Sequence, residues 1–269
     1  MDLTDKQNLQ LLFKKHGLRP LKRFGQNFII EKGAVEGVVS GAELDEQDVV
    51  LEIGPGVGTL TRELAKRAKR VLAVEKDPEM VTILKETLGD FKNIEVIQQD
   101  IRRLKPVVKN YKVVGNLPFY LTAPVIRMFL ELSEARPVSM TLVVQKEVAQ
   151  RICAQPPHMS ILANAVQFYA DPKIISVIPK GSFFPQPKVD AALIRITPRP
   201  APMGDSKKFF EIVKAGFSHP RKQLLNNLAQ GLKKSREAVV IWLQKNNVSP
   251  QQRAETLSVD DWLRLTVNC

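Results

Sequence analysis

The stretch Val49–Leu60 constrains the fold of this chain more than any other part of the sequence. An apolar run ends on Glu52-Ile53, glycines alternate at Gly54, Gly56 and Gly58, and helix-forming residues follow. This pattern predicts a buried strand that enters a tight turn and then a helix. In open α/β sheets such a turn lies at the carboxyl end of a parallel strand, where ligands bind. We therefore expect a ligand site at this loop.

The glycine spacing argues against a dinucleotide ligand. A dinucleotide-binding loop follows the pattern G-x-G-x-x-G, and the N-terminus of its helix holds the pyrophosphate. Here the pattern is G-x-G-x-G with Pro55 inside it, and Thr59 opens the helix. The loop favours a nucleoside ligand without phosphates, such as S-adenosylmethionine.

Three further short strands are predicted downstream, and a polar residue follows the apolar part of each. These residues are Glu75 after residues 71–74, Asp100 after residues 94–97, and Asn116 after residues 112–115. A carboxylate about 20 residues beyond a nucleotide loop can accept both ribose hydroxyls, and Asp100 can accept the exocyclic amine of adenine. A helix cap explains each acid on its own equally well, but it explains the whole series poorly. We expect these residues to share one edge of the sheet.

The charge of the chain favours a polyanionic partner. The net charge is +12 and the isoelectric point is about 9.7, beyond what solubility requires. Contacts to phosphates release condensed counterions, so nucleic acid is the natural partner of such a surface. The alternative is an enzyme whose positive charge has no role in binding a partner.

Composition also bears on metals and on location. Cys153 and Cys269 are too few for a disulfide scaffold, and the three histidines show no ligand spacing, so we expect no metal site. No apolar run reaches the ~20 residues that cross a bilayer. The first residues lack the apolar core of a signal peptide. We therefore expect a cytoplasmic protein that does not associate with membranes.

Three motifs together resemble a known enzyme family. The tetrad Asn116-Leu117-Pro118-Phe119 is similar to the motif of methyltransferases that modify the exocyclic amine of adenine. With Gln26–Ile29 upstream and Phe183–Asp190 downstream, the chain resembles the ribosomal RNA adenine dimethyltransferase family, in its small-subunit branch. The resemblance runs from about Phe24 to Leu265.

The resemblance implies an activity and a set of site residues. The expected reaction transfers methyl groups from S-adenosylmethionine to the N6 amines of adenosines near the 3′ end of small-subunit (16S) ribosomal RNA. It gives N6,N6-dimethyladenosine during ribosome assembly. The implied cofactor contacts are Asn27, Ile29, Gly54, Glu75, Asp100 and Asn116, with Gln26 and Gly56 as weaker candidates. The implied catalytic residues are Asn116, Leu117, Pro118, Phe119 and Phe183.

Chemical roles can be assigned to several of these residues. The side-chain oxygen of Asn116 can accept a hydrogen bond from the adenine amine, and a backbone carbonyl near Pro118 can accept a second. Phe119 and Phe183 can stack on the two faces of a base splayed from the RNA. Core packing is the alternative for both phenylalanines. Packing is the expected role of Tyr120.

The chain is expected to form two domains. Strands and helices alternate up to residue 198, which predicts a Rossmann-like methyltransferase domain over residues 1–198 with helices on both faces of the sheet. The resemblance implies seven mostly parallel strands, with an antiparallel last strand inserted. After a proline-rich linker, residues 203–269 read as basic helices only, and we expect them to position RNA. We expect a monomer that acts on a pre-30S particle.

Two other functions remain open at this point. Relatives that confer macrolide resistance methylate a large-subunit adenosine, but they more often carry Ile after the Asn of the tetrad, where this chain has Leu117. A ribosome-assembly or RNA-binding factor without activity is the other possibility. The intact tetrad and glycine loop argue against lost catalysis.

Overall fold

The computed structural model describes residues 1–18, 26–104, 109–132, 135–201 and 203–268. Phe24, at which the resemblance begins, and the linker residue Pro202 lie outside these ranges. The chain forms two compact units, one of residues 1–149 and 173–198 and the other of residues 150–172 and 199–269. No helix within the described ranges is long and apolar enough to span a bilayer.

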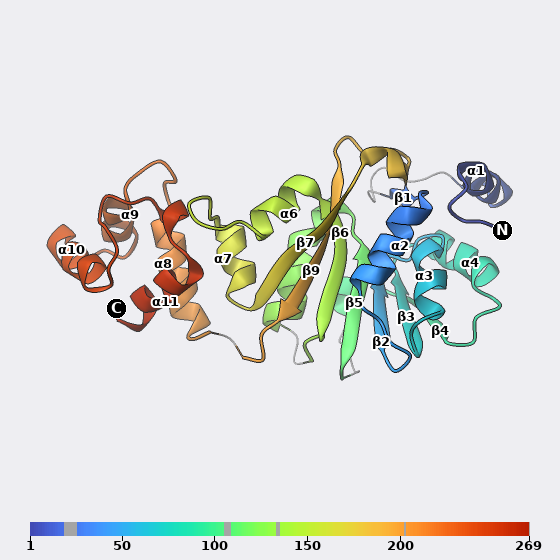
Figure 1. Cartoon of the computed structure of the whole chain (residues 1–269), viewed down its shortest axis with the longest axis horizontal. Helices are drawn as coiled ribbons and strands as arrows, with labels where there is room; N and C mark the ends of the chain where they lie inside the picture. Colours follow the sequence, from blue (N-terminus) through green and yellow to red (C-terminus); the bar gives the residue numbers. More distant parts are fainter. Residues whose placement is uncertain (19–25, 105–108, 133–134, 202, 269) are drawn as a thin grey trace. The chain divides into compact units, whose positions relative to one another are not determined.

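The first unit is built on a seven-stranded sheet (Figure 1). The strands, in spatial order, are β4 (Ile94–Gln98), β3 (Arg70–Glu75), β2 (Val49–Ile53), β5 (Tyr111–Asn116), β6 (Ser139–Gln145), β9 (Ala191–Pro198) and β7 (Ala170–Ile178). The first five run parallel, and β9 is antiparallel to β6. The fold class and the antiparallel insertion are therefore as expected.

Helices follow the strands in the order that a doubly wound fold requires. The α-helices are α1 (Lys6–Lys15), α2 (Lys32–Gly41), α3 (Thr59–Ala65), α4 (Pro78–Thr87), α5 (Thr122–Arg127), α6 (Lys146–Ile152), α7 (Ile161–Gln167), α8 (Ser206–Gly216), α9 (Leu224–Gly231), α10 (Arg236–Lys245) and α11 (Val259–Val267). Short turns of helix include η2 (Ile101–Arg103), η3 (Phe119–Leu121) and η5 (Lys180–Ser182).

Both faces of the central strands β2, β3, β5, β6 and β9 are buried, which is why these strands read as continuous apolar runs, whereas the edge strands β4 and β7 are more exposed. Successive side chains of a strand point to opposite faces. On β2, Val50 packs in one cluster with α2 and α3 through Val38 and Leu64, whereas Leu51 is buried on the opposite face. This packing fixes the strands in register, so the ends of β2, β3 and β5 meet at one edge: Ile53 lies opposite both Val74 and Gly115.

A second, two-stranded sheet brings two distant motifs together. In it β1 (Phe28–Ile29) pairs antiparallel with β8 (Phe183–Phe184), with Phe28 opposite Phe184 and Ile29 opposite Phe183. Helix α1 packs onto this region because its apolar residues share a cluster with Phe28 and with Val57 of the glycine loop. The rings of Phe13 and Phe28 are 5.3 Å apart. Helix α1 therefore packs against the glycine loop through Val57.

The second unit is helical, but its boundary differs from the expected one. Residues 150–172, which the sequence assigned to the first domain, belong to this unit with residues 199–269. Phe168 explains the difference, because its ring lies 4.4 Å from the ring of Phe209 on α8 and neither side chain is exposed. Side chains cap α8, α10 and α11 at their first turns, including a capping box at Ser258.

Candidate active site

One pocket lies at the carboxyl edge of the sheet and contains all six residues that the resemblance assigned to the cofactor. Its volume is about 980 Å³, including the open mouth. The six residues lie among those that line it: Asn27, Ile29, Gly54, Glu75, Asp100 and Asn116. The weaker candidates Gln26 and Gly56 line it as well. The polar residues meet there because β2, β3, β4 and β5 end at the same edge.

The glycine loop adopts conformations that other residues avoid. Gly54, Gly56 and Gly58 have φ angles of 66°, 59° and 92°. At Gly56 a Cβ atom would come within 2.8 Å of the Phe28 ring, so the motif around Phe28 closes over the loop. At Gly54 a Cβ atom would meet nothing within 4 Å. Gly54 thus leaves open space beside its backbone in the pocket.

Glu75 is held at the end of β3 by three backbone amides. Its Oε1 accepts hydrogen bonds from the amides of Lys76 and Asp77 at 2.7 and 2.8 Å, and its Oε2 accepts one from Gly56 at 3.2 Å. Burial raises the pKa of the carboxyl and these hydrogen bonds oppose the rise. Since each carboxylate oxygen can accept more than one hydrogen bond, Glu75 retains capacity for hydroxyl donors.

Asp100 is already engaged by two basic side chains. Arg102 donates from its backbone amide and Nε to Oδ1, at 3.1 and 3.0 Å, and from its guanidinium to Oδ2 at 2.6 Å. The ammonium of Lys76 lies 3.2 Å from Oδ2. The hydrogen bonds from the Arg102 side chain are the main cause that holds the pKa of the Asp100 carboxyl well below its usual range, and Lys76 contributes to the same shift. A further donor at Asp100 therefore requires Arg102 or Lys76 to shift, because a carboxylate offers about four acceptor sites.

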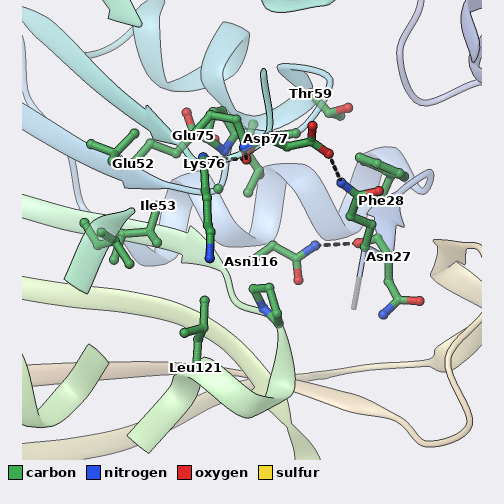
Figure 2. Close-up of a pocket in the computed structure, with 18 of the residues that line it drawn as sticks. Asn27, Phe28, Glu52, Ile53, Thr59, Glu75, Lys76, Asp77, Asn116 and Leu121 are labelled. Atoms are coloured by element: carbon green, nitrogen blue, oxygen red, sulfur yellow. Dashed lines mark hydrogen bonds between the residues drawn. The ribbon is translucent and has the colours of Figure 1, made fainter. Parts of the chain in front are cut away.

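Asn116 is fixed by a hydrogen bond to the upstream motif. Its Nδ2 donates to the backbone carbonyl of Asn27 at 2.7 Å, drawn as a dashed line in Figure 2. Next to it, the Nε2 of Gln26 donates to Asp77 at 3.0 Å. The first bond assigns the nitrogen of the Asn116 amide and leaves its oxygen as the acceptor. Residues 26 and 27 are thus tied to the ends of β3 and β5.

The other three tetrad residues differ in their surroundings, and only one of them lines the pocket. Pro118 lines the pocket, and its carbonyl accepts a hydrogen bond from the amide of Leu121 at 2.8 Å. Leu117 is 2 % exposed and Phe119 is half-buried, and neither is among the lining residues. Tyr120, for which packing was expected, is instead 54 % exposed and lines the pocket.

Phe183 does not lie where a stacking role requires. Its side chain is 4 % exposed and belongs to the core cluster that contains Ile29, Val35 and Ile178. The pairing of β1 with β8 places it opposite Ile29 and turns its ring into the core. Phe183 therefore corresponds to the alternative weighed from the sequence, a core position, and its contribution to the site is to hold the Ile29 backbone in place.

Several residues of the pocket had no role assigned from the sequence. They include Glu52, Lys76, Asp77 and Thr59. Position after a strand was a usable signal for Lys76 and Asp77, which directly follow Glu75. Glu52 carried a signal too, since a charged residue inside an otherwise apolar strand is unusual. Within the described ranges, no group of three or more His, Cys, Asp or Glu is placed to hold a metal ion.

Within residues 203–269, which we expect to position RNA, the candidate phosphate contacts are the basic residues Lys207, Lys208, Arg221, Lys222, Lys233, Lys234 and Arg236, and most of them are exposed. In the second unit Lys207, Arg221, Lys222 and Lys233 are exposed, whereas Lys208 is half-buried. Two others make local contacts: Lys234 lies over the Trp242 ring at 5.3 Å, and Arg236 donates to Asn226. The first four are therefore the better candidates for contacts with phosphates.

Comparison with known proteins agrees with this geometry. A family model described as ribosomal RNA adenine dimethylase matches residues 18–268. A relative from Dehalococcoides mccartyi (strain ATCC BAA-2266 / KCTC 15142 / 195), named ribosomal RNA small subunit methyltransferase A, is 43 % identical, covering 94 % of this chain and 90 % of its own. A relative of the same name from Bacillus pumilus (strain SAFR-032) is 37 % identical, covering 95 % and 93 %.

Two solved structures share the fold over most of the chain. The 23S rRNA methyltransferase ErmE has a TM-score of 0.76 at 28 % identity, and the match covers 90 % of this chain and 99 % of that one. A dimethyladenosine transferase from Plasmodium falciparum has a TM-score of 0.74 at 23 % identity, covering 88 % and 95 %. The second likeness concerns the fold alone.

Proposed function

Because the chain belongs to the ribosomal RNA adenine dimethylase family, we propose that it transfers methyl groups from S-adenosylmethionine to adenosine N6 amines near the 3′ end of small-subunit ribosomal RNA. The product is N6,N6-dimethyladenosine. One observation carries this proposal: the six residues assigned to the cofactor line a single pocket that also contains Pro118 of the tetrad. The higher identity to small-subunit methyltransferases than to ErmE favours the small subunit.

The residues of the pocket fit S-adenosylmethionine by their chemistry. Gly54 offers open space beside the backbone, and the carboxylates of Glu75 and Asp100 lie at the ends of β3 and β4. Carboxylates suit the hydroxyls and amine of a nucleoside and disfavour phosphates, so the donor set agrees with the glycine spacing. In this assignment Glu75 accepts from the ribose hydroxyls, and Asp100 accepts from the adenine amine after Arg102 or Lys76 shifts.

Asn116 and Pro118 act on the amine that is methylated. The cofactor supplies a methyl group already activated on a cationic sulfur, so the protein contributes position more than acid or base chemistry. The Asn116 oxygen accepts one hydrogen of the target amine, and its Nδ2 bond to Asn27 keeps that oxygen in place. The Pro118 carbonyl retains a lone pair for the second hydrogen beside its bond to Leu121. Two acceptors favour a pyramidal nitrogen whose lone pair faces the methyl group.

Aromatic contacts to the target base are assigned to the turn η3, which begins at Phe119, the last residue of the tetrad. Phe119 is half-buried there and Tyr120 is exposed at the pocket. Stacking on a base contributes about 1–3 kcal/mol per contact. We assign this role to Phe119 and add Tyr120 in place of the buried Phe183.

The RNA partner is supported by charge. The net charge of +12 favours an anionic surface larger than the target nucleotide. We propose that the substrate is the assembling small-subunit (pre-30S) particle, that the chain acts on it as a monomer, and that residues 203–269 help to position it.

Replacing Glu75 with alanine should weaken S-adenosylmethionine binding by about 10- to 100-fold, the loss of a hydrogen bond to a charged group. Glu75→Gln should lose less, because it keeps one acceptor oxygen for the backbone amides around it. Calorimetry measures both, with the exposed Glu79→Ala on α4 as control and thermal melting as a check on folding. Unchanged affinity in a folded Glu75→Ala protein would remove this residue from the cofactor site.

Methyl transfer from labelled S-adenosylmethionine tests the function directly. Purified protein is incubated with small-subunit particles that lack the modification and, separately, with large-subunit particles. Label should appear in the small-subunit RNA as N6,N6-dimethyladenosine. Label in large-subunit RNA alone would favour the resistance-type reaction, and RNA binding without any transfer would favour an assembly factor.

A further inference from the structure

The carboxylate of Asp100, which is assigned to the adenine amine, is already filled with donors in the free protein. Its Oδ1 accepts from the backbone amide and the Nε of Arg102, at 3.1 and 3.0 Å. Its Oδ2 accepts from the Arg102 guanidinium at 2.6 Å and lies 3.2 Å from the ammonium of Lys76. A carboxylate offers about four acceptor sites, two on each oxygen. An adenine amine can therefore bond to Asp100 only by displacing one of these donors.

The donors of Arg102 are the harder ones to displace. One of them is the backbone amide that the Asp100 side chain caps at the start of η2, so it is part of the turn itself. The other two are Nε and the guanidinium, which reach both carboxylate oxygens together in the bidentate geometry of the stronger ion pairs. Arg102 is also not among the residues that line the pocket, so a ligand approaches Asp100 from another side.

Lys76 is the donor that a ligand in the pocket meets. It lines the pocket together with Asp100, and its side chain extends away from Glu75 (Figure 2). The side chain is 54 % exposed, and its 3.2 Å contact with Oδ2 is the longest of the four. The Lys76 backbone amide is held by Glu75 at 2.7 Å, so the side chain can leave Asp100 without a change in the main chain. A single exposed ion pair of this kind contributes little free energy.

We propose that Lys76 competes with the adenine amine for Oδ2 of Asp100, and that the cofactor binds by displacing the Lys76 ammonium into solvent. Lys76 is thereby a specificity-determining residue, because it reduces the advantage that Asp100 gives to a purine with an amine at C6. A purine with a carbonyl at C6 has an oxygen there that can accept from the ammonium, so it leaves the ion pair in place. This assignment rests on the proposed function, since it takes adenine as the group that meets Asp100.

Replacing Lys76 with methionine should strengthen cofactor binding. Methionine keeps the apolar part of the side chain and removes the competing ammonium. S-adenosyl-L-homocysteine, the donor without its methyl group, should bind about two- to fivefold more tightly, which corresponds to the contribution of an exposed ion pair. S-inosyl-L-homocysteine, which differs only in the carbonyl at C6, should bind no more tightly than before. The selectivity for the amine should therefore rise by about twofold or more.

The same competition predicts an effect of salt on the wild-type protein. Added salt shortens the screening length from about 10 Å at about 0.1 M to about 3 Å at about 1 M, and so weakens the exposed ion pair of Lys76 with Asp100. The affinity for S-adenosyl-L-homocysteine relative to S-inosyl-L-homocysteine should therefore rise with salt. The two ligands carry the same charge, so other electrostatic effects cancel in the ratio. In the Lys76→Met variant the ratio should not depend on salt.

Calorimetry with both ligands measures these affinities, and thermal melting checks the folding of each variant. Lys85→Met, which removes an exposed lysine of α4, should behave as wild type. Equal or weaker binding of S-adenosyl-L-homocysteine by a folded Lys76→Met protein would overturn the assignment and leave the proposed function standing. A wild-type ratio that does not change with salt would overturn it even if the variant fails to fold. If wild-type protein binds neither ligand, the proposed function itself fails.

Discussion

Replacing Asn116 with alanine should slow methyl transfer by about 10³-fold, the effect of removing one oriented hydrogen-bonding group at a reacting centre. RNA affinity should change little, because it derives mainly from phosphate contacts elsewhere. The reason lies in the amide: its nitrogen donates to the carbonyl of Asn27 at 2.7 Å, so its oxygen is positioned before the target amine arrives.

Single-turnover kinetics and RNA binding, measured on the same preparation, separate these two effects. Thermal melting checks that the loss of the Asn27 bond has not unfolded the upstream motif. A folded Asn116→Ala protein that transfers methyl groups at near wild-type rate would contradict the mechanism, and one that loses rate and RNA affinity equally would indicate a structural role.

Removing four exposed positive charges from the second unit should weaken binding to the small-subunit particle by about 10²-fold at moderate salt. The changes are to glutamine, at Lys207, Arg221, Lys222 and Lys233. Binding should also become less dependent on salt, with the slope of log K against log salt reduced by about 0.7–0.9 for each phosphate that the variant no longer neutralises. Cofactor affinity should not change, because every residue of the pocket lies in the first unit.

A matched variant controls for net charge. Changing Arg67, Lys69, Lys85 and Lys92 to glutamine removes the same four charges from exposed positions on the first unit. Equal losses in the two variants would show that overall charge, not the helical unit, determines binding. Substitution is a cleaner test than truncation after residue 202, because truncation would remove Phe209 from its contact with Phe168 and expose the remaining core.

The sheet and the meeting of polar residues at its edge could be predicted because both depend on local patterns. Buried strands of a parallel sheet have continuous apolar runs, and the residues that follow them must meet at one edge. Glu75, which ends β3, and Asp100, which follows β4, accordingly line the same pocket. Asn27 and Ile29 were identified by resemblance, since no local pattern predicts the hydrogen bond between Asn116 at the end of β5 and the carbonyl of Asn27.

Other features depend on contacts between distant segments. Phe183 faces the core because β8 pairs with β1, and nothing within the Phe-rich stretch determines that pairing. Residues 150–172 join the second unit through the Phe168 side chain, although they lie between two strands of the sheet in sequence. The side chain of Arg102, in the turn η2, donates hydrogen bonds to the carboxylate of Asp100. The sequence indicated the acid at position 100 but not that its oxygens already accept these hydrogen bonds.

Mass spectrometry of small-subunit ribosomal RNA from cells that lack this protein tests the central claim most directly. N6,N6-dimethyladenosine near the 3′ end should be absent, should return when the wild-type chain is supplied, and should stay absent when the Asn116→Ala chain is supplied. Unmodified adenosine at those positions, with large-subunit RNA unchanged, is the predicted result. Dimethyladenosine at normal levels in the small-subunit RNA of such cells would contradict the account.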